Sequence, residues 1–395
     1  GTELVALDAT GECPRVTVRG QDGVEEDEYV WVAGCDGATS TVRGLAGIGW
    51  SGSAYRHDIL LADVELSGSM RADSVHLGLG RRGLCLLFPC GESAAWRLLA
   101  TRPTNTSTTE AGQFGPPLPR AELAQVLAEA RIPARISDVA WSSRIGLQHR
   151  LAESYRRGGV FIAGDAAHVN SPAGGQGMNT GIQDAANLGW KLALAPKSAR
   201  LEELLDSYEQ ERRPVARSVR RLTDVVFLAE SSTDPLTAWV RGSIAPHVGK
   251  LLPTVMGRRR LVAHGFRLAA QLGVGYRRSV LSVPPSPWWA RGLRPGDRLP
   301  DADVTVDGRT ARVHEAIASP GVHLLIGPDG SVPIVNRDTV SVHRVDAPQW
   351  PGVIAVRPDG YVGLVADSVD DIALRRWLLM VGAANEWSVA RSRGV

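Results

Sequence analysis

Residues 164–188 read GDAAHVNSPAGGQGMNTGIQDAANL, and this stretch decides the fold. A short apolar strand is expected just before it at Val160–Ala163, and Gly164 ends that strand. The glycines that follow lack Cβ atoms, so the loop backbone can approach a flat or anionic ligand closely. A helix is expected from about Thr180 to Leu194, and its first N–H groups face the same space. The stretch therefore predicts a strand, a ligand-binding loop and a helix.

Asp165 stands at the end of the expected strand, where its carboxylate can accept hydrogen bonds from sugar-like hydroxyls. A carboxylate there does not suit bare phosphate. The run GGQGMN (174–179) taken alone is equally consistent with a plain glycine-rich turn. The whole string from Gly164 to Leu188 favours a ligand site over that alternative.

A second segment, residues 35–43 (CDGATSTVR), follows a strand expected at Glu28–Ala33 and opens a short helix at Ser40–Leu45. A simple turn with Ser40 as the N-cap of that helix is the alternative interpretation. The segment lies about 130 residues before Asp165, and this spacing is more informative than either motif alone.

A third region begins after the prolines at 284–287 (PPSP), which mark a boundary. Residues 293–301 read LRPGDRLPD and residues 357–362 read RPDGYV. Strands expected at Asp303–Thr305, Val322–Ile326, Val353–Val356 and Tyr361–Val365, with a helix at Ser368–Gly382, predict a separate small α/β domain.

Together these segments resemble the single-component FAD-dependent aromatic hydroxylases, a family that shares the p-hydroxybenzoate hydroxylase fold. Residues 164–188 are similar to the family's GD flavin motif and residues 35–43 to its DG motif. Residues 293–301 and 357–362 resemble the linker and closing hairpin of the thioredoxin-like C-terminal domain in aromatic polyketide and rifamycin-type monooxygenases. The family's N-terminal GxGxxG unit, which holds the ADP half of FAD, has no counterpart in the chain, and we expect it upstream of Gly1.

The resemblance implies an α/β fold of the p-hydroxybenzoate hydroxylase type with a β-sheet substrate domain and a small thioredoxin-like C-terminal domain. No CxxC accompanies that last domain, so we expect it to serve packing or assembly. The implied order is part of the FAD-binding domain at 1–50, the substrate-binding sheet at 51–140, the rest of the FAD-binding domain at 141–215, a helical segment at 216–283 and the thioredoxin-like domain at 284–395.

The resemblance also implies which residues hold the cofactor. Asp165 is expected on the ribityl chain, and the glycine-rich loop is expected to line the isoalloxazine. The full set of implied FAD contacts is Asp36, Gly37, Arg43, Asp165, Pro172, Gly174, Gly175, Gln176, Gly177, Met178 and Asn179. The sequence names no catalytic base; Tyr55, His57, His76 and Arg97 are weak candidates, since each of these residue types is more often structural.

By this resemblance, NAD(P)H reduces FAD, the reduced flavin reacts with O2, and a C4a-hydroperoxide hydroxylates an aromatic polyketide or related phenolic natural product. Baeyer–Villiger insertion into a ketone by the same peroxyflavin is an alternative that the sequence does not separate. A flavin-fold protein that binds such a ligand without oxidising it is a second alternative.

Composition narrows the classes of protein to which the chain can belong. The chain has 395 residues, so two or three domains are expected, and its formal charge of +2 offers no field for nucleic acid or an anionic membrane. Its four cysteines show no metal or disulfide spacing, and no apolar stretch is long enough for a membrane span. We therefore expect a cytoplasmic monomer or homodimer without a metal site.

The other expected elements follow from local pattern. Strands are expected at Glu3–Asp8, Arg15–Arg19, Arg56–Leu66, Ser74–Leu79, Leu84–Pro89 and Ala95–Ala100, and a helix at Arg120–Ala130. A further helix at Leu201–Arg213 is expected to end near Pro214, because a helix is disfavoured before proline.

Overall fold

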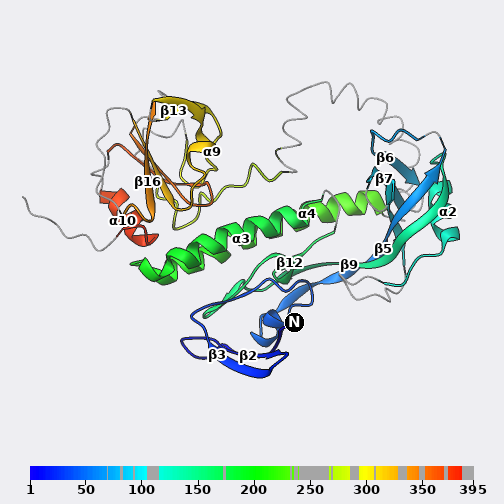
Figure 1. The fold of residues 1–395 in the computed structure, drawn as a ribbon, viewed down its shortest axis with the longest axis horizontal. Helices are drawn as coiled ribbons and strands as arrows, with labels where there is room; N and C mark the ends of the chain where they lie inside the picture. Colours follow the sequence, from blue (N-terminus) through cyan, green and yellow to red (C-terminus); the bar gives the residue numbers. More distant parts are fainter. Residues whose placement is uncertain are drawn as a thin grey trace, which may run out of the picture. The chain divides into compact units, whose positions relative to one another are not determined.

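The structure is a computed structural model, and its elements form two compact units (Figure 1). The first unit is Gly1–Thr180 with Ala216–Ala270, and the second is Gly181–Val215 with Gln271–Val395. The residues that the structure describes are 1–68, 70–80, 83–91, 94–104, 115–171, 175–231, 234, 239, 267, 270–284, 293–306, 308–327, 336–346, 352–368 and 372–384.

The first unit opens with an antiparallel meander of β1 (Glu3–Asp8), β2 (Arg15–Gly20) and β3 (Gly23–Glu28). The strands expected at Glu3–Asp8 and Arg15–Arg19 are thus confirmed. The strand expected at Glu28–Ala33 is confirmed only in part: it overlaps β4 (Val32–Gly34), whereas β3 ends at Glu28 and residues 29–31 lie in no strand. All six residues of β3 are exposed, so backbone pairing with β2 forms this strand without an apolar pattern.

A second small sheet has the order β10-β11-β4. Its strands are β4 (Val32–Gly34), β10 (Arg156–Arg157) and β11 (Val160–Ile162), and β11 runs parallel to β4. Helix α1 (Thr41–Leu45) follows β4, with Ser40 as its N-cap. Parallel pairing means that the chain leaves β4 and β11 at the same edge of the sheet.

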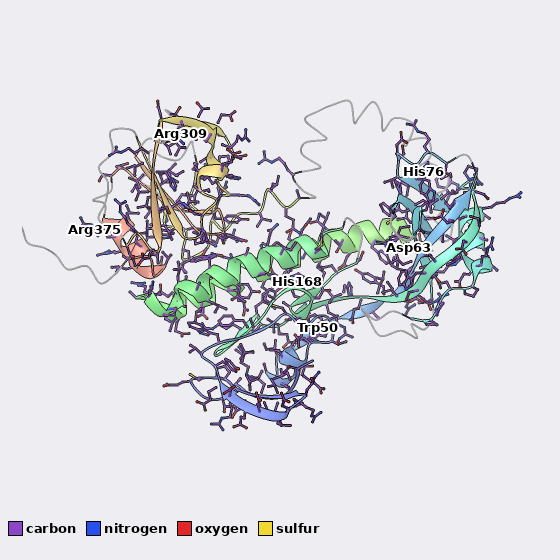
Figure 2. All side chains as sticks on the ribbon, viewed as in Figure 1. Trp50, Asp63, His76, His168, Arg309 and Arg375 are labelled. Atoms are coloured by element: carbon purple, nitrogen blue, oxygen red, sulfur yellow. The ribbon has the colours of Figure 1, made fainter. Side chains whose placement is uncertain are left out.

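The largest sheet of the first unit has six strands in the order β12-β9-β5-β8-β7-β6. Two strands of 18 residues, β5 (Trp50–Ser67) and β9 (Arg135–Ala152), form its centre. In Figure 2, Trp50 and His168 lie near one end of these strands and Asp63 and His76 near the other. The remaining strands are β6 (His76–Gly80), β7 (Gly83–Pro89), β8 (Trp96–Pro103) and β12 (His168–Val169).

The two faces of this sheet have different partners because side chains alternate along each strand. Leu60 and Leu98 belong to a buried cluster with Leu123 and Leu127 of α2 (Arg120–Glu129). Ile59, on the opposite face, belongs to a smaller cluster described below. The strands and helix expected between residues 56 and 130 are confirmed within a few residues of their ends.

Two long helices follow the six-stranded sheet. Helix α3 (Gly177–Leu194) begins three residues before the expected Thr180, and α4 (Leu201–Ser231) continues through Pro214. The helix end expected near Pro214 is therefore wrong. Glu211 and Ala216, on either side of the proline, are both buried, and packing on both sides outweighs the one backbone hydrogen bond that proline removes. None of the helices in the described ranges is long and apolar enough to cross a membrane.

The second unit contains a mixed sheet in the order β14-β13-β16-β15-β17-β18. Helix α10 contributes Trp377, which contacts Gly363 of β18 so closely that a Cβ there would lie 2.0 Å from the indole. The expected strands and helix of this region are confirmed, whereas its thioredoxin-like identity stays a prediction. Its elements are β13 (Asp303–Val306), β14 (Arg309–Arg312), α9 (Val313–Ala316), β15 (Val322–Ile326), β16 (Val340–Asp346), β17 (Val353–Val356), β18 (Val362–Ala366) and α10 (Ile372–Met380).

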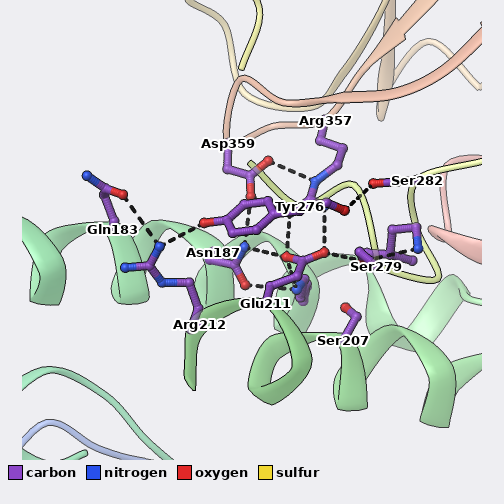
Figure 3. A network of polar contacts seen from close by, with 12 residues as sticks. Gln183, Asn187, Ser207, Glu211, Arg212, Tyr276, Ser279, Ser282, Arg357 and Asp359 are labelled. Carbon is purple, nitrogen blue, oxygen red and sulfur yellow. Dashed lines mark hydrogen bonds and ion pairs between the residues drawn. The ribbon is translucent and has the colours of Figure 1, made fainter. Parts of the chain in front are cut away.

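A buried ionic network joins α3 and α4 to the loop after β17 within the second unit (Figure 3). The Glu211 carboxylate accepts hydrogen bonds from Lys191 Nζ at 2.8 Å and from both terminal nitrogens of Arg357 at 2.7 and 2.8 Å. Asn187 bridges Glu211 and Asp359. Burial alone raises the pKa of Glu211, but the charges of Arg357 and Lys191 hold it well below its usual range.

Candidate functional site

The two motifs of the sequence meet at one edge of the small parallel sheet. Residues 35–43 follow β4 and residues 164–188 follow β11, and Ile162 pairs with Gly34 at the ends of the two strands. The N–H of Ala163 extends the pairing by donating to Gly34 O at 3.0 Å. The structure therefore brings together two loops that lie far apart in the sequence.

The first loop is a tight turn capped by its own side chains. Gly37 has φ +84°, a conformation that favours glycine. Asp36 accepts hydrogen bonds from Ser40 Oγ at 2.5 Å and from the N–H of Val42 at 3.0 Å. Ser40 Oγ in turn accepts from the N–H of Arg43 at 2.9 Å. The N-cap interpretation of Ser40 is confirmed, and Asp36 holds the turn from within.

Arg43 connects the first loop to the second. Its Nη2 donates to Ala38 O and its Nη1 to Ala166 O, both at 2.9 Å. The guanidinium carbon also lies 3.9 Å from the ring centroid of Trp50. Burial lowers the pKa of Arg43, while the charge of Asp36 opposes this shift. Arg43 thus fixes the distance between the loops, and a direct cofactor contact by Arg43 stays a prediction.

The second loop presents an open carboxylate. Gly164 has φ +60° and starts a 3-10 turn, Gly164–Ala166, which carries Asp165. Asp165 is exposed, yet neighbouring protein atoms remove part of its hydration and raise its pKa. Within the described ranges, its carboxylate accepts no hydrogen bond. Such a group is suited to accept hydrogen bonds from ligand hydroxyls.

The glycine-rich segment forms the N-terminus of α3. Gly175 has φ +62°, and a Cβ at Gly175 or Gly177 would meet no atom of the described residues within 4 Å, so these residues leave space beside both glycines. Gly177, Met178 and Asn179 make up the first turn of α3, which contains no acidic residue. The N–H groups of this turn form the positive end of the helix dipole, and no acidic side chain of the turn offsets that charge. Pro172 and Gly174 of the expected site lie outside the described residues.

Side chains in this first turn point in different directions. Gln176 is buried, and its carbonyl accepts hydrogen bonds from the N–H and hydroxyl of Thr180 at 3.0 and 2.8 Å. Met178 is 75% exposed, which is unusual for a large apolar side chain. These features fit the flavin that the resemblance implies: hydroxyl acceptors at Asp165, and open backbone with positive partial charge at Gly175–Asn179.

The four weak catalytic candidates lie in three places. Tyr55 and His57 both contact the ring of Phe227, at centroid distances of 4.6 and 5.6 Å. Arg97 forms a two-point ion pair with Asp63 at 2.7 and 2.9 Å. His76 lies on the edge strand β6, where its ring contacts Trp96 and its Nε2 lies 2.9 Å from Arg71 O. Only Tyr55 and His57 therefore share a location.

Two residues beside Tyr55 were not expected from the sequence. His149 of β9 lies 4.7 Å from Tyr55 between ring centroids, and Asp224 of α4 accepts a hydrogen bond from Tyr55 Oη. Their proximity depends on the register of β5 with β9 and on the continuation of α4 past Pro214. No local sequence signal carries that information.

A hollow of about 1170 Å³ lies in the second unit, and residues of α10 line it together with residues 199–203, Val280 and Val283. None of these residues belongs to either motif. No group of three or more His, Cys, Asp or Glu side chains in the described ranges is arranged to hold a metal ion.

Comparison with known proteins gives a consistent family. The family model described as "FAD binding domain" matches residues 1–223. A 6-methylpretetramide 4-monooxygenase from Streptomyces rimosus is 35% identical over 340 residues, which are 83% of this chain and 58% of that protein. A dialkyldecalin synthase from Streptomyces rugosporus is 32% identical over 95% of this chain and 73% of its own length.

A solved structure shows the same fold. The anhydrotetracycline hydroxylase from Streptomyces rimosus superposes with a TM-score of 0.73 at 28% identity, covering 97% of this chain and 76% of that one. The chain thus spans between 58% and 76% of the length of these three proteins. The expected fold class is confirmed.

Proposed function

The chain belongs to the FAD binding domain family, and on that premise we propose that it is an FAD-dependent monooxygenase that hydroxylates an aromatic polyketide or related phenolic natural product. NAD(P)H is the reductant and O2 the oxidant in this proposal. The first relative is named a monooxygenase of 6-methylpretetramide and the solved neighbour a hydroxylase of anhydrotetracycline, and these names support the reaction and the substrate class.

One structural observation carries the proposal. The ends of β4 and β11 present the two motif loops at one sheet edge, with the Asp165 carboxylate open to a ligand and the first turn of α3 free of acidic residues. In this arrangement Asp165 would accept hydrogen bonds from the ribityl hydroxyls of FAD, and the backbone of Gly175 and Gly177 would hold the isoalloxazine. Bound FAD supplies the electron transfer and the activation of O2.

The protein's own contribution is position and charge. Arg43 keeps the two loops at a fixed separation through Ala38 and Ala166. The N–H groups at the start of α3 stabilise negative charge on a bound ring. An aromatic substrate is proposed to bind over Leu61, Leu99 and Ile145, the partly buried residues that pack against the buried cluster of Ile59, Leu147 and Phe227. This cluster belongs to the same unit as residues 35–43 and 164–180.

The test is NADPH oxidation by the FAD-loaded full chain, with and without a hydroxylated tetracyclic polyketide. We expect the polyketide to accelerate NADPH oxidation and to gain the mass of one oxygen atom. The methyl ether of the same compound is the matched control and should gain little oxygen. A yellow, FAD-loaded protein that converts neither compound contradicts the monooxygenase proposal.

A second candidate function is suggested by the dialkyldecalin synthase, whose name describes ring formation. In that case the chain binds a polyketide and converts it without adding oxygen. Product of unchanged mass, formed equally well under argon and without NADPH, identifies this function. Baeyer–Villiger insertion also adds one oxygen, but the product then loses its ketone carbonyl, which carbon NMR detects.

A further inference from the structure

Four side chains from β5, β9 and α4 form a continuous polar chain in the first unit. Ser53 Oγ lies 2.8 Å from His149 Nε2, and His149 Nδ1 lies 3.0 Å from Asp224 Oδ1. Tyr55 Oη donates to the same Asp224 oxygen. The chain therefore starts at Ser53, which is exposed, and ends at a carboxylate that accepts two hydrogen bonds.

The sheet register sets this geometry. Ser53 and His149 are direct partners in the pairing of β5 with β9. Gly52 allows the close approach: its φ is +135°, and a Cβ there would lie 2.0 Å from His149 O. A bulge between Ala54 and Asp58 inserts extra residues in β5, and such bulges redirect nearby side chains. Tyr55, within the bulge, contacts α4 through Asp224.

The directions of these hydrogen bonds leave His149 Nε2 as the atom that can accept a proton. A carboxylate accepts hydrogen bonds and donates none, so His149 donates from Nδ1 to Asp224. The lone pair of Nε2 then faces Ser53 Oγ. Burial and the hydrogen bond to Asp224 raise the pKa of Tyr55, so this phenol remains a donor. In this arrangement the imidazole can act as a general base, and the carboxylate orients it.

Other charged and titratable groups lie on the same three elements. The charge of Arg220, also on α4, lowers the pKa of Tyr55, against the larger effect of burial. On β9, the neighbouring Arg150 donates to Gln148 Oε1 at 2.6 Å. His57 contacts the Phe227 ring edge-on at 5.6 Å. Tyr55, Asp224, Arg220, Arg150 and His57 are thus among the titratable or charged groups that β5, β9 and α4 contribute near His149.

The surroundings match a hydroxylated aromatic ligand. Ile59, Leu147 and Phe227 form a buried apolar cluster. The partly buried residues Tyr55, Leu61, Leu99 and Ile145 pack against it, so the polar chain borders apolar side chains that are in part accessible. The GD motif is close by in the sheet, because Val169 of β12 pairs with Arg150, the residue next to His149. A ligand hydroxyl near Ser53 would therefore lie beside both the apolar surface and the strand that leads to the flavin loop.

We propose that His149, acting through Ser53, is the general base that ionises the phenolic or enolic hydroxyl of the substrate, with Asp224 and Tyr55 as positioning residues. This inference rests on the proposed function. The substrate O–H bond breaks as its proton passes to Ser53 Oγ, and the Ser53 proton passes to His149 Nε2. The products are a substrate oxyanion and an imidazolium ion paired with the Asp224 carboxylate. The extra electron density makes the ring a better nucleophile towards an electrophilic oxygen.

The test uses the full chain with alizarin, a hydroxyanthraquinone whose phenolate absorbs at longer wavelength than the phenol. Bound alizarin is titrated with pH and its spectrum recorded. We expect the midpoint of bound alizarin in the unaltered protein to lie below that of free alizarin. In His149→Gln the midpoint should rise by about one pH unit, because the proton acceptor is lost. Asp224→Asn should move it in the same direction by less.

The controls separate the possible failures. His314→Gln, in the second unit, should leave the midpoint unchanged. If His149→Gln fails to fold, Ser53→Ala at an exposed position carries the test, and the same upward shift is expected. A midpoint that stays unmoved in the folded variants overturns the relay and leaves the monooxygenase proposal intact. If neither alizarin nor its dimethyl ether binds, the proposed substrate class is wrong and the relay fails with it.

Discussion

Arg43 and Ala166 lie 123 residues apart in the sequence, yet the Arg43 guanidinium donates a 2.9 Å hydrogen bond to the Ala166 carbonyl. The same side chain donates to Ala38 and contacts Trp50. The loop after β4 and the loop after β11 are thus tied together by one buried cation. Arg43 thus adds a side-chain connection to the backbone pairing of β4 with β11.

Arg43→Ala should lower the free energy of unfolding by about 3 kcal/mol, because two charge-assisted hydrogen bonds and a cation–π contact are lost. Urea denaturation followed by circular dichroism measures the change. The matched control is Arg19→Ala, which removes an exposed arginine paired with Glu3 and should cost at most about 0.5 kcal/mol. Equal losses in the two variants would show that Arg43 does not tie the loops.

Asp165→Ala should weaken FAD binding about tenfold, since one hydrogen bond from a ligand hydroxyl to a charged acceptor is lost. The free energy of unfolding without FAD should hardly change, because this exposed carboxylate accepts no hydrogen bond within the described ranges. Flavin fluorescence titration measures the affinity. Unchanged flavin retention in the variant would count against a ribityl contact at Asp165.

Glu211→Gln should destabilise the second unit by about 3–5 kcal/mol, because it leaves Lys191 and Arg357 buried without their shared carboxylate. Glu203→Gln on the same helix is the control: its pair with Arg200 is exposed and contributes at most about 0.5 kcal/mol. Chemical denaturation of both variants provides the comparison. Similar stabilities would mean that the network is not a stabilising element.

Lys191 should make stability depend on pH in the alkaline range. Burial lowers its pKa from 10.5 to about 8, although the charge of Glu211 opposes this shift. Between these values the unfolded chain holds a proton that the folded chain has released, so the free energy of unfolding rises with pH. The slope from this residue is at most about 1.4 kcal/mol per pH unit. Denaturation of wild type and Lys191→Met at pH 8, 9 and 10 should show the slope only in wild type.

Gly52→Ala should lower the free energy of unfolding by about 3 kcal/mol. The new methyl group would overlap His149 O, and the residue would have to adopt a backbone conformation that alanine avoids. Gly189→Ala, in the exposed middle of α3 with no atom near the new Cβ, should instead stabilise the protein by about 0.5–1 kcal/mol. Thermal unfolding of the two variants gives opposite signs. Two shifts of the same sign would contradict the close approach of β5 and β9.

The parts that sequence reasoning predicted are those fixed by local chemistry. Gly164 ends β11 because of its positive φ, and Ser40 caps α1 through its own hydroxyl. Both signals lie within a few residues of the structure that they specify. The strand β3 escaped prediction because its sequence, GVEEDE, has no apolar alternation and depends on pairing with β2.

The polar chain from Ser53 to Asp224 could not be predicted for a different reason. Its members come from residues 53, 55, 149 and 224, and their contacts require the register of two strands and a helix that continues past Pro214. A proline is read locally as the end of a helix. Here α4 continues past Pro214, because Glu211 and Ala216 are packed on either side of it. The continued helix places Asp224 within hydrogen-bond distance of Tyr55.

The contact between the Gly52 backbone and His149 O also divides this surface into positions that can and cannot vary. Mutation can change Leu61, Leu99 or Ile145, the partly buried residues that pack against the apolar cluster, to suit a ligand of another shape. Position 52 must remain glycine in every such variant, since any side chain there separates the two strands that hold Ser53 against His149. The choice of ligand can thus change through these apolar residues while Ser53 and His149 stay in contact.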